Sequence, residues 1–178
     1  MIKSNVEQWL KNVVIGLNLC PFASRPFDDN RVRIQISEST TEEELLQDLA
    51  DEIKLLDQSP AQELETTLLV VSEFLSDFED YNQFLDMVDL LLEQFNWTGL
   101  YQIASFHPDY QFAETEPDDA ENLTNRAPYP ILHIIREASV EAALEKYPNP
   151  ESIPQKNIQT VESLTEKQKR ELFPYLFK

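Results

Sequence analysis

The residues with the richest chemistry lie between His107 and His133. His107 directly precedes a proline at the end of an expected strand, where an imidazole can serve as a general acid or base. Asn125 and Arg126 precede a turn that two prolines stiffen, and the Arg126 guanidinium offers a planar fork of donors suited to a carboxylate or phosphate. The alternative for Arg126 is an ion pair with carboxylates of its own loop. The segment predicts a site for a small anionic molecule.

Cys20 is a candidate nucleophile if His107 approaches it, because a neighbouring imidazolium lowers the pKa of a thiol. Its place between Leu19 and Pro21 also fits a small buried apolar group. As the single cysteine of the chain, it excludes an intramolecular disulfide and fits a reducing compartment. We therefore expect a cytoplasmic protein.

A zinc-like metal site is the second hypothesis. Cys20, His107, His133 and one carboxylate are suitable ligand types for such an ion. They lack diagnostic spacing, because neither CxxC nor HxxxH occurs in the chain. His133 also shares an expected strand face with Ile131 and Ile135, which favours a histidine packed in the core.

The chain contains only two glycines, Gly16 and Gly99. Loops that bind phosphate need several glycines so that backbone amides can approach the phosphate closely. The count therefore excludes a phosphate loop, a dinucleotide fingerprint and a kinase glycine loop, and it also excludes the Gly-x-Ser-x-Gly nucleophile elbow. No cofactor is identified by the sequence.

The formal net charge is −19, from 14 basic and 33 acidic side chains. Such a charge repels phosphate backbones and anionic lipid surfaces, so we expect neither nucleic acid nor membrane as a partner. Most of the excess is expected on solvated helix faces. A third hypothesis is a non-catalytic module whose acidic face engages a basic protein; the sequence does not predict an oligomeric state.

Apolar residues recur with helical spacing in four segments and alternate or run continuously in four others. Helices are expected at 4–16, 41–56, 76–95 and 139–147, and strands at 32–36, 67–71, 100–106 and 131–135. The alternation predicts a single α/β domain over 1–178 with a four-stranded mixed sheet, three strands parallel and one antiparallel, flanked by helices. We interpret 108–130 as a long functional loop and 148–178 as a C-terminal helical extension.

Ligands of open α/β sheets gather beyond the carboxyl ends of parallel strands. Glu73 and His107 follow two such ends, and an antiparallel fourth strand would bring Asn125, Arg126 and Tyr129 to the same edge. The leading hypothesis is therefore that the protein binds or transforms a small anionic metabolite there. His107 and Cys20 are the catalytic candidates, and Asn125, Arg126, Tyr129 and Glu73 are the ligand-binding candidates. Arg136 lies at the far end of its strand and is expected to form a structural ion pair.

Short motifs distributed over residues 5–145 make the chain similar to a known family. They are Trp9, Leu17-Asn18-Leu19-Cys20-Pro21-Phe22-Ala23, Phe106-His107-Pro108 with Tyr110 and Phe112, Asp119, Asn122, Thr124-Asn125-Arg126, Pro128-Tyr129-Pro130, His133 and Arg136-Glu137. With them the chain resembles the bacterial domain-of-unknown-function 1415 family. The resemblance implies no activity, cofactor or catalytic residue. Ala127 stands where a serine is more usual in the family, so no role for a hydroxyl is implied there.

Overall fold

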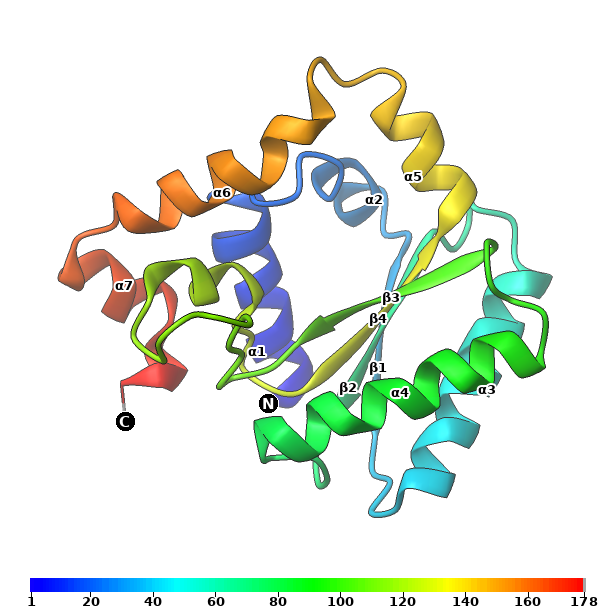
Figure 1. Cartoon of the computed structure of the whole chain (residues 1–178). Helices are drawn as coiled ribbons and strands as arrows, with labels where there is room; N and C mark the ends of the chain where they lie inside the picture. The colour runs from blue at the N-terminus through cyan, green and yellow to red at the C-terminus, as the bar shows by residue number, and fades with distance from the viewer. Residues whose placement is uncertain (178) are drawn as a thin grey trace.

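The computed structural model describes residues 1–177 (Figure 1). The strands are β1 Val32–Ser37, β2 Thr66–Val71, β3 Tyr101–Phe106 and β4 Ile131–Arg136. The α-helices are α1 Ile2–Trp9, α2 Ser24–Asp28, α3 Glu42–Gln58, α4 Phe78–Gln94, α5 Glu137–Leu144, α6 Ile153–Glu162 and α7 Glu166–Leu172. A π-helix, η1 Leu10–Ile15, continues α1, and three short 3-10 helices are η2 Ala120–Asn125, η3 Pro150–Ser152 and η4 Pro174–Leu176.

The four strands form one mixed sheet in the order β1-β2-β4-β3. The predicted α/β class and single four-stranded mixed sheet are confirmed, but the three strands predicted to form its parallel part do not pair with one another, because the sheet has only one parallel pair. Only β1 and β2 pair in parallel, whereas β4 inserts between β2 and β3 and is antiparallel to both. Ile131, Leu132 and Ile134 of β4 are fully buried, and a strand buried on both faces belongs in the middle of a sheet.

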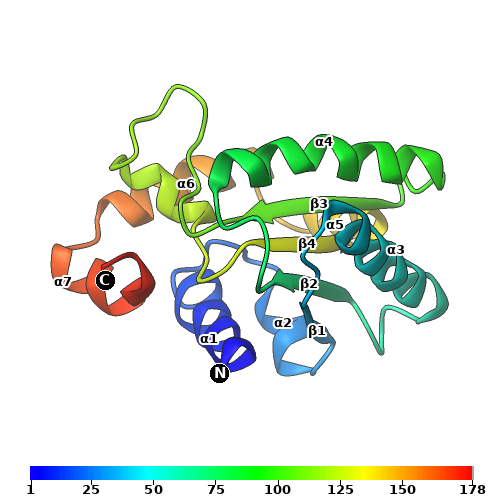
Figure 2. The same ribbon diagram turned by 90° about the horizontal axis from the view of Figure 1, so that it is seen from below.

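Each face of the sheet has its own apolar core. Because side chains of a strand alternate between faces, Leu69 and Val71 of β2 pack under α3 and α4, whereas Leu68 and Val70 face the opposite layer. That opposite layer contains α1, η1 and the C-terminal residues through Phe173. Figure 2 shows α3 and α4 on one side of the sheet and α1 and α2 on the other.

The helices begin within one or two residues of the predicted positions, and two of these shifts change the N-cap. α1 begins at Ile2, so Ser4 lies inside the helix rather than capping it. α4 is capped by Asp77 instead of Ser76, and the Asp77 carboxylate accepts from the amides of Glu79 and Asp80. A carboxylate at a helix N-terminus satisfies unpaired amides and interacts favourably with the helix dipole.

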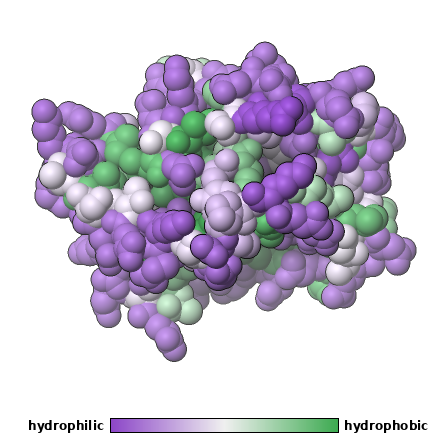
Figure 3. Space-filling model, turned by 90° about the horizontal axis from the view of Figure 1, so that it is seen from above, coloured by the Kyte–Doolittle hydropathy of each residue, from purple (hydrophilic) through white to green (hydrophobic). Residues whose placement is uncertain are grey.

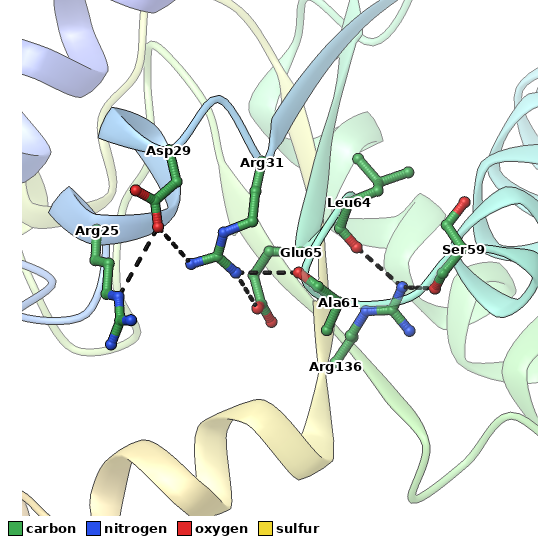
Figure 4. Close-up of polar contacts among 8 residues, drawn as sticks. All are labelled: Arg25, Asp29, Arg31, Ser59, Ala61, Leu64, Glu65 and Arg136. Atoms are coloured by element: carbon green, nitrogen blue, oxygen red, sulfur yellow. Dashed lines mark hydrogen bonds and ion pairs between the residues drawn. The ribbon is translucent and has the colours of Figure 1, made fainter.

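Arg136 ties the carboxyl end of β4 to Ser59, the C-cap residue of α3, and to Leu64, as Figure 4 shows. Its Nη2 donates to the carbonyl oxygens of Leu56, Ser59 and Leu64 at 2.7, 2.8 and 3.0 Å. The predicted structural role is therefore present, but the partners are carbonyls rather than a carboxylate. A guanidinium at the C-terminus of a helix satisfies its last carbonyls and complements its dipole.

The segment 108–130, interpreted as a long loop, contains the 3-10 helix η2, which packs against α6. The region after α5 therefore contacts the segment that precedes β4. Asn122 in η2 is fully buried, and its amide donates to the carbonyl of Glu116 and accepts from the amide of Phe112. These bonds give the acidic part of the segment a defined conformation.

Negative charge is concentrated in one layer of the molecule. Residues 38–100, which include α3 and α4, carry 17 of the 33 acidic side chains and a single basic one, Lys54. The layer of α6 and α7 lies at the opposite end of the molecule (Figure 1). Within residues 1–177, no helix combines the length and apolar character needed to cross a membrane.

Candidate ligand-binding site

The chain brings His107 next to Asn125 and Arg126 at the carboxyl edge of the sheet. The His107 amide donates to the carbonyl of Asn125 at 3.2 Å, and the Ala127 amide donates to the carbonyl of His107 at 3.4 Å. Segment 108–130 therefore leaves β3 and returns beside it before β4 begins. Three predicted site residues lie close together here. Whether they can bind a ligand depends on which of their polar atoms are free.

His107 is fully buried, and both of its ring nitrogens have partners. Nδ1 accepts from the amide of Asp109 at 3.0 Å, so Nε2 carries the proton and donates to the carbonyl of Leu75 at 3.1 Å. Burial lowers the pKa of His107, which holds the ring neutral. An acid or base role would require one of these two bonds to break, because both ring nitrogens have partners.

The Arg126 guanidinium donates hydrogen bonds to its own loop. Nε donates to the carbonyl of Tyr110 at 3.1 Å and Nη2 to that of Pro117 at 2.7 Å. The Arg126 carbonyl in turn accepts from Trp9 Nε1 and the Tyr175 hydroxyl, each at 3.1 Å. Nε and Nη2 are thus bound to carbonyl oxygens of the same loop rather than directed at a ligand.

Asn125 and Tyr129 fasten the same segment at two other points. The Asn125 amide donates to the carbonyl of Ser105 at 3.1 Å, and the Tyr129 hydroxyl accepts from Asn5 Nδ2 at 3.0 Å. The first bond joins the segment to β3, and the second joins it to α1. Both side chains therefore position the backbone.

Glu73 lies in a hollow on the acidic side of the sheet edge. This acidic hollow has a volume of about 440 Å³ and is lined by Glu42, Glu73, Phe74, Leu75, Ser76, Asp77, Asp80 and Gln83. Four of these eight residues carry carboxylates, which repel an anion. The electrostatics of this edge are thus the reverse of those expected for an anion site.

Cys20 is half-buried among the apolar residues of the α1 side. Burial raises the pKa of its thiol, and hydrogen bonds from the Phe22 and Ala23 backbone only partly oppose that effect. His107 does not activate it, because the partners of that ring are Leu75 and Asp109. The thiol is therefore protonated at neutral pH and is a weak nucleophile.

This environment predicts slow alkylation of Cys20. At pH 7 we expect iodoacetamide to react with the folded protein about 10-fold more slowly than with the urea-unfolded chain, because the thiolate is the reacting species. Mass spectrometry of quenched samples gives a clean readout, since Cys20 is the single cysteine. Equal or faster labelling of the folded chain would contradict the structural assignment.

A second hollow of about 440 Å³ lies between the loop after η1 and helix α6. This α6 hollow is lined by Leu17, Asn18, Pro21, Tyr147, Ile153, Lys156, Asn157, Gln159, Thr160 and Ser163. None of the ten is acidic, in a chain with 33 acidic residues, and Lys156 is the one charged member. Figure 3 looks onto α5 and α6 and shows apolar surface among hydrophilic side chains on this face.

The π-helix η1 shapes one wall of the α6 hollow. Its wide turns bring the Asn12 carbonyl so close to Gly16 that a Cβ at that position would collide with it. The chain then turns sharply at Asn18, which has a φ of 54°, a left-handed conformation that asparagine tolerates. The Asn157 amide locks this wall to α6 by donating to the carbonyl of Leu19 at 2.7 Å.

An aromatic residue and a cation share the opposite wall. The Tyr147 and Phe22 rings are nearly perpendicular, at 82°, with centroids 5.5 Å apart. Lys156 Nζ lies 6.0 Å from the centroid of Tyr147. Asn18, Lys156 and Gln159 are exposed at the rim, so a ligand can reach their polar groups from solvent.

Sequence reasoning missed Lys156 and Tyr147 because they lie in or next to the region interpreted as a helical extension. They reach the hollow because α6 packs beside Asn18 and Pro21, and the Asn157–Leu19 hydrogen bond joins these segments across 138 residues of sequence. The one signal that pointed to this place was the motif from Leu17 to Ala23, which contains Asn18 and Pro21.

The structure offers no support for the metal hypothesis at the predicted ligands. In the part of the chain that is described, no three His, Cys, Asp or Glu residues are arranged to hold a metal ion. His133 Nε2 hydrogen-bonds the Thr66 hydroxyl at 2.8 Å, and burial lowers its pKa to about 4. That residue is a neutral, largely buried histidine of the sheet.

Comparison with known proteins identifies one family. A family model described as Protein of unknown function (DUF1415) matches residues 1–171, nearly the whole chain. No curated protein and no solved structure matches the chain. The match agrees with the motifs quoted above, and its description assigns no activity.

Proposed function

Because the chain belongs to the DUF1415 family, whose description gives no activity, we propose its function from the geometry: it binds a small anionic molecule in the α6 hollow. The observation that carries the proposal is the composition of this hollow. It combines one ammonium group with neutral polar and apolar residues and contains no carboxylate.

Electrostatics favour this hollow over the edge of the sheet. The acidic hollow at that edge carries Glu42, Glu73, Asp77 and Asp80, whereas the α6 hollow carries Lys156 alone. In a chain with a net charge of −19, an anion is repelled from most of the surface. A pocket lined without carboxylates and provided with an ammonium repels an anion less than the acidic hollow does.

The size of the α6 hollow also suits a small molecule. Ligand pockets typically have volumes of roughly 300–1,000 Å³ and combine apolar walls with a few polar groups that orient the ligand. The volume of about 440 Å³ falls in this range. Asn18 and Gln159 supply amides, and the apolar wall is formed by Leu17, Pro21 and Ile153.

The proposal is one of binding rather than of catalysis. The thiol of Cys20 is held protonated by burial, and the His107 ring is bound on both nitrogens. The two side chains that the sequence offered for nucleophilic and acid-base chemistry are thus engaged in the fold. The proposed ligand is still a small anion, as in the hypothesis from the sequence, but its proposed site is the α6 hollow instead of the sheet edge.

Replacing Lys156 with glutamine tests the proposal. Isothermal titration calorimetry with a panel of acetate, benzoate, cyclohexanecarboxylate and phosphate should find binding to the unmodified protein. Lys156→Gln should weaken that binding about 10-fold, because a hydrogen bond to a charged group is lost. Lys146→Gln removes an equal charge from an exposed residue outside the lining and should change the affinity less than about 2-fold.

Two results would count against the proposal. One is that no anion of the panel binds to the unmodified protein. The other is that Lys146→Gln and Lys156→Gln weaken binding equally, since that outcome would indicate a general charge effect rather than a defined site.

A further inference from the structure

We infer, building on the proposed function, that the α6 hollow takes an aromatic monocarboxylate, with its ring against Tyr147 and its carboxylate at Lys156. The inference rests on three features of the hollow. They are the accessible Tyr147 ring beside an ammonium, an apolar wall with room for a ring, and a donor set that suits one negative charge.

The Tyr147 ring is in place to receive a flat ligand. It lines the hollow, it is only partly buried, and its near-perpendicular contact with Phe22 fixes its orientation. The ammonium of Lys156 lies over the face of this ring, 6.0 Å from the centroid, so that face is turned toward the cation. A ligand ring packed on Tyr147 would therefore place its acid group within reach of Lys156.

The hollow is larger than a bare anion requires. A volume of about 440 Å³ leaves space for an apolar part of the ligand in addition to its carboxylate. This apolar part of the ligand can contact the side chains of Leu17, Pro21 and Ile153 and the Tyr147 ring. Aromatic pairs gain free energy beyond their area burial, so Tyr147 favours a ring over an aliphatic group of the same size.

The donors of the hollow suit a carboxylate better than a phosphate. Phosphate sites commonly use arginine forks or a nest of backbone amides in a glycine-rich turn. The lining contains one lysine and no arginine, and neither glycine of the chain belongs to it. A single ammonium with the Asn18 and Gln159 amides at the rim matches a monoanion.

Two ligands of matched size and charge, benzoate and cyclohexanecarboxylate, test the inference. In calorimetric titrations of the full chain, we expect benzoate to bind roughly 3- to 10-fold more tightly than cyclohexanecarboxylate, which reflects the aromatic contact. Tyr147→Leu should abolish this preference, whereas Tyr147→Phe should keep it. Unfolding midpoints of both variants, measured alongside, show whether the fold is retained; if Tyr147→Leu is unfolded, the comparison of the two ligands on the unmodified chain and on Tyr147→Phe decides.

The outcomes separate this inference from the proposed function. Equal affinity for the two carboxylates in the unmodified protein would overturn the aromatic assignment, while a Lys156-dependent site for anions would still stand. Tighter binding of phosphate than of benzoate would overturn the monocarboxylate assignment in the same way. If no anion binds, both the aromatic-monocarboxylate inference and the proposed function are overturned.

Discussion

Replacing Arg136 with methionine is expected to lower the free energy of unfolding by about 3 kcal/mol, because three partly buried carbonyl oxygens lose their donor. The Nη2 atom of Arg136 serves the carbonyls of Leu56, Ser59 and Leu64, and methionine fills a similar volume with no donor. The charge that complements the C-terminal end of α3 is lost in the same substitution. Urea denaturation followed by circular dichroism measures the change.

Arg25→Met is the matched control. The Arg25 side chain is 87% exposed and makes a long ion pair of 3.8 Å with Asp29, also visible in Figure 4. An exposed pair of this kind contributes roughly 0–1 kcal/mol, so the control should unfold close to the midpoint of the unmodified protein. A loss for Arg136→Met no larger than that for Arg25→Met would refute the capping role.

Lowering the pH from 6.5 to about 4 is expected to destabilise the fold through its two histidines. Burial lowers the pKa of His133 from 6.5 to about 4 and lowers that of His107 as well. Above pH 6.5 both histidines are neutral whether the chain is folded or unfolded, and their contribution to stability is complete. As the pH falls, the unfolded chain binds protons that the folded chain does not, at a cost for His133 of about 1.4 kcal/mol per pH unit. His133 alone accounts for roughly 3 kcal/mol over this range.

His133→Gln isolates this effect from the acidic surface. Protonation of carboxylates on a chain with a charge of −19 relieves repulsion and stabilises the fold, which opposes the histidine effect. Glutamine keeps an N–H donor for the Thr66 hydroxyl but does not titrate, and the carboxylates remain the same. Urea unfolding across the pH range should therefore give a shallower loss for the variant. Identical slopes would show that His133 is not held neutral.

The pattern of the sequence predicted the kind of fold but not its strand order. Period-2 alternation identified β1 as a half-buried strand, and it does lie at an edge of the sheet. Two strands, Thr66–Val71 and Ile131–Arg136, are each mostly apolar, so their composition does not tell which strand is their neighbour in the sheet. In the structure both strands are central, and β4 lies between β2 and β3. The expectation that β1, β2 and β3 would pair in parallel through their connecting helices was therefore wrong.

The candidate site was harder to predict for a different reason. Residue types such as His107 and Arg126 indicate chemistry, but hydrogen bonds to Leu75, Tyr110 and Pro117 decide whether their polar groups are available. Those partners are backbone carbonyls, which every residue has. The pattern of side chains in the sequence therefore cannot predict these hydrogen bonds. Lys156 belongs to no motif, and the role proposed for it depends on a lining without carboxylates that only the folded chain assembles.

Chemical-shift mapping tests most directly whether the anion binds in the α6 hollow. In a titration of isotope-labelled, assigned protein with benzoate, we expect the largest amide shifts in residues 17–23 and 147–163, which surround the α6 hollow. Residues His107, Asn125 and Arg126 should change little, since their side chains are bound within the fold. Shifts concentrated at His107, Asn125 and Arg126, with α6 unaffected, would contradict the account and return the site to the edge of the sheet.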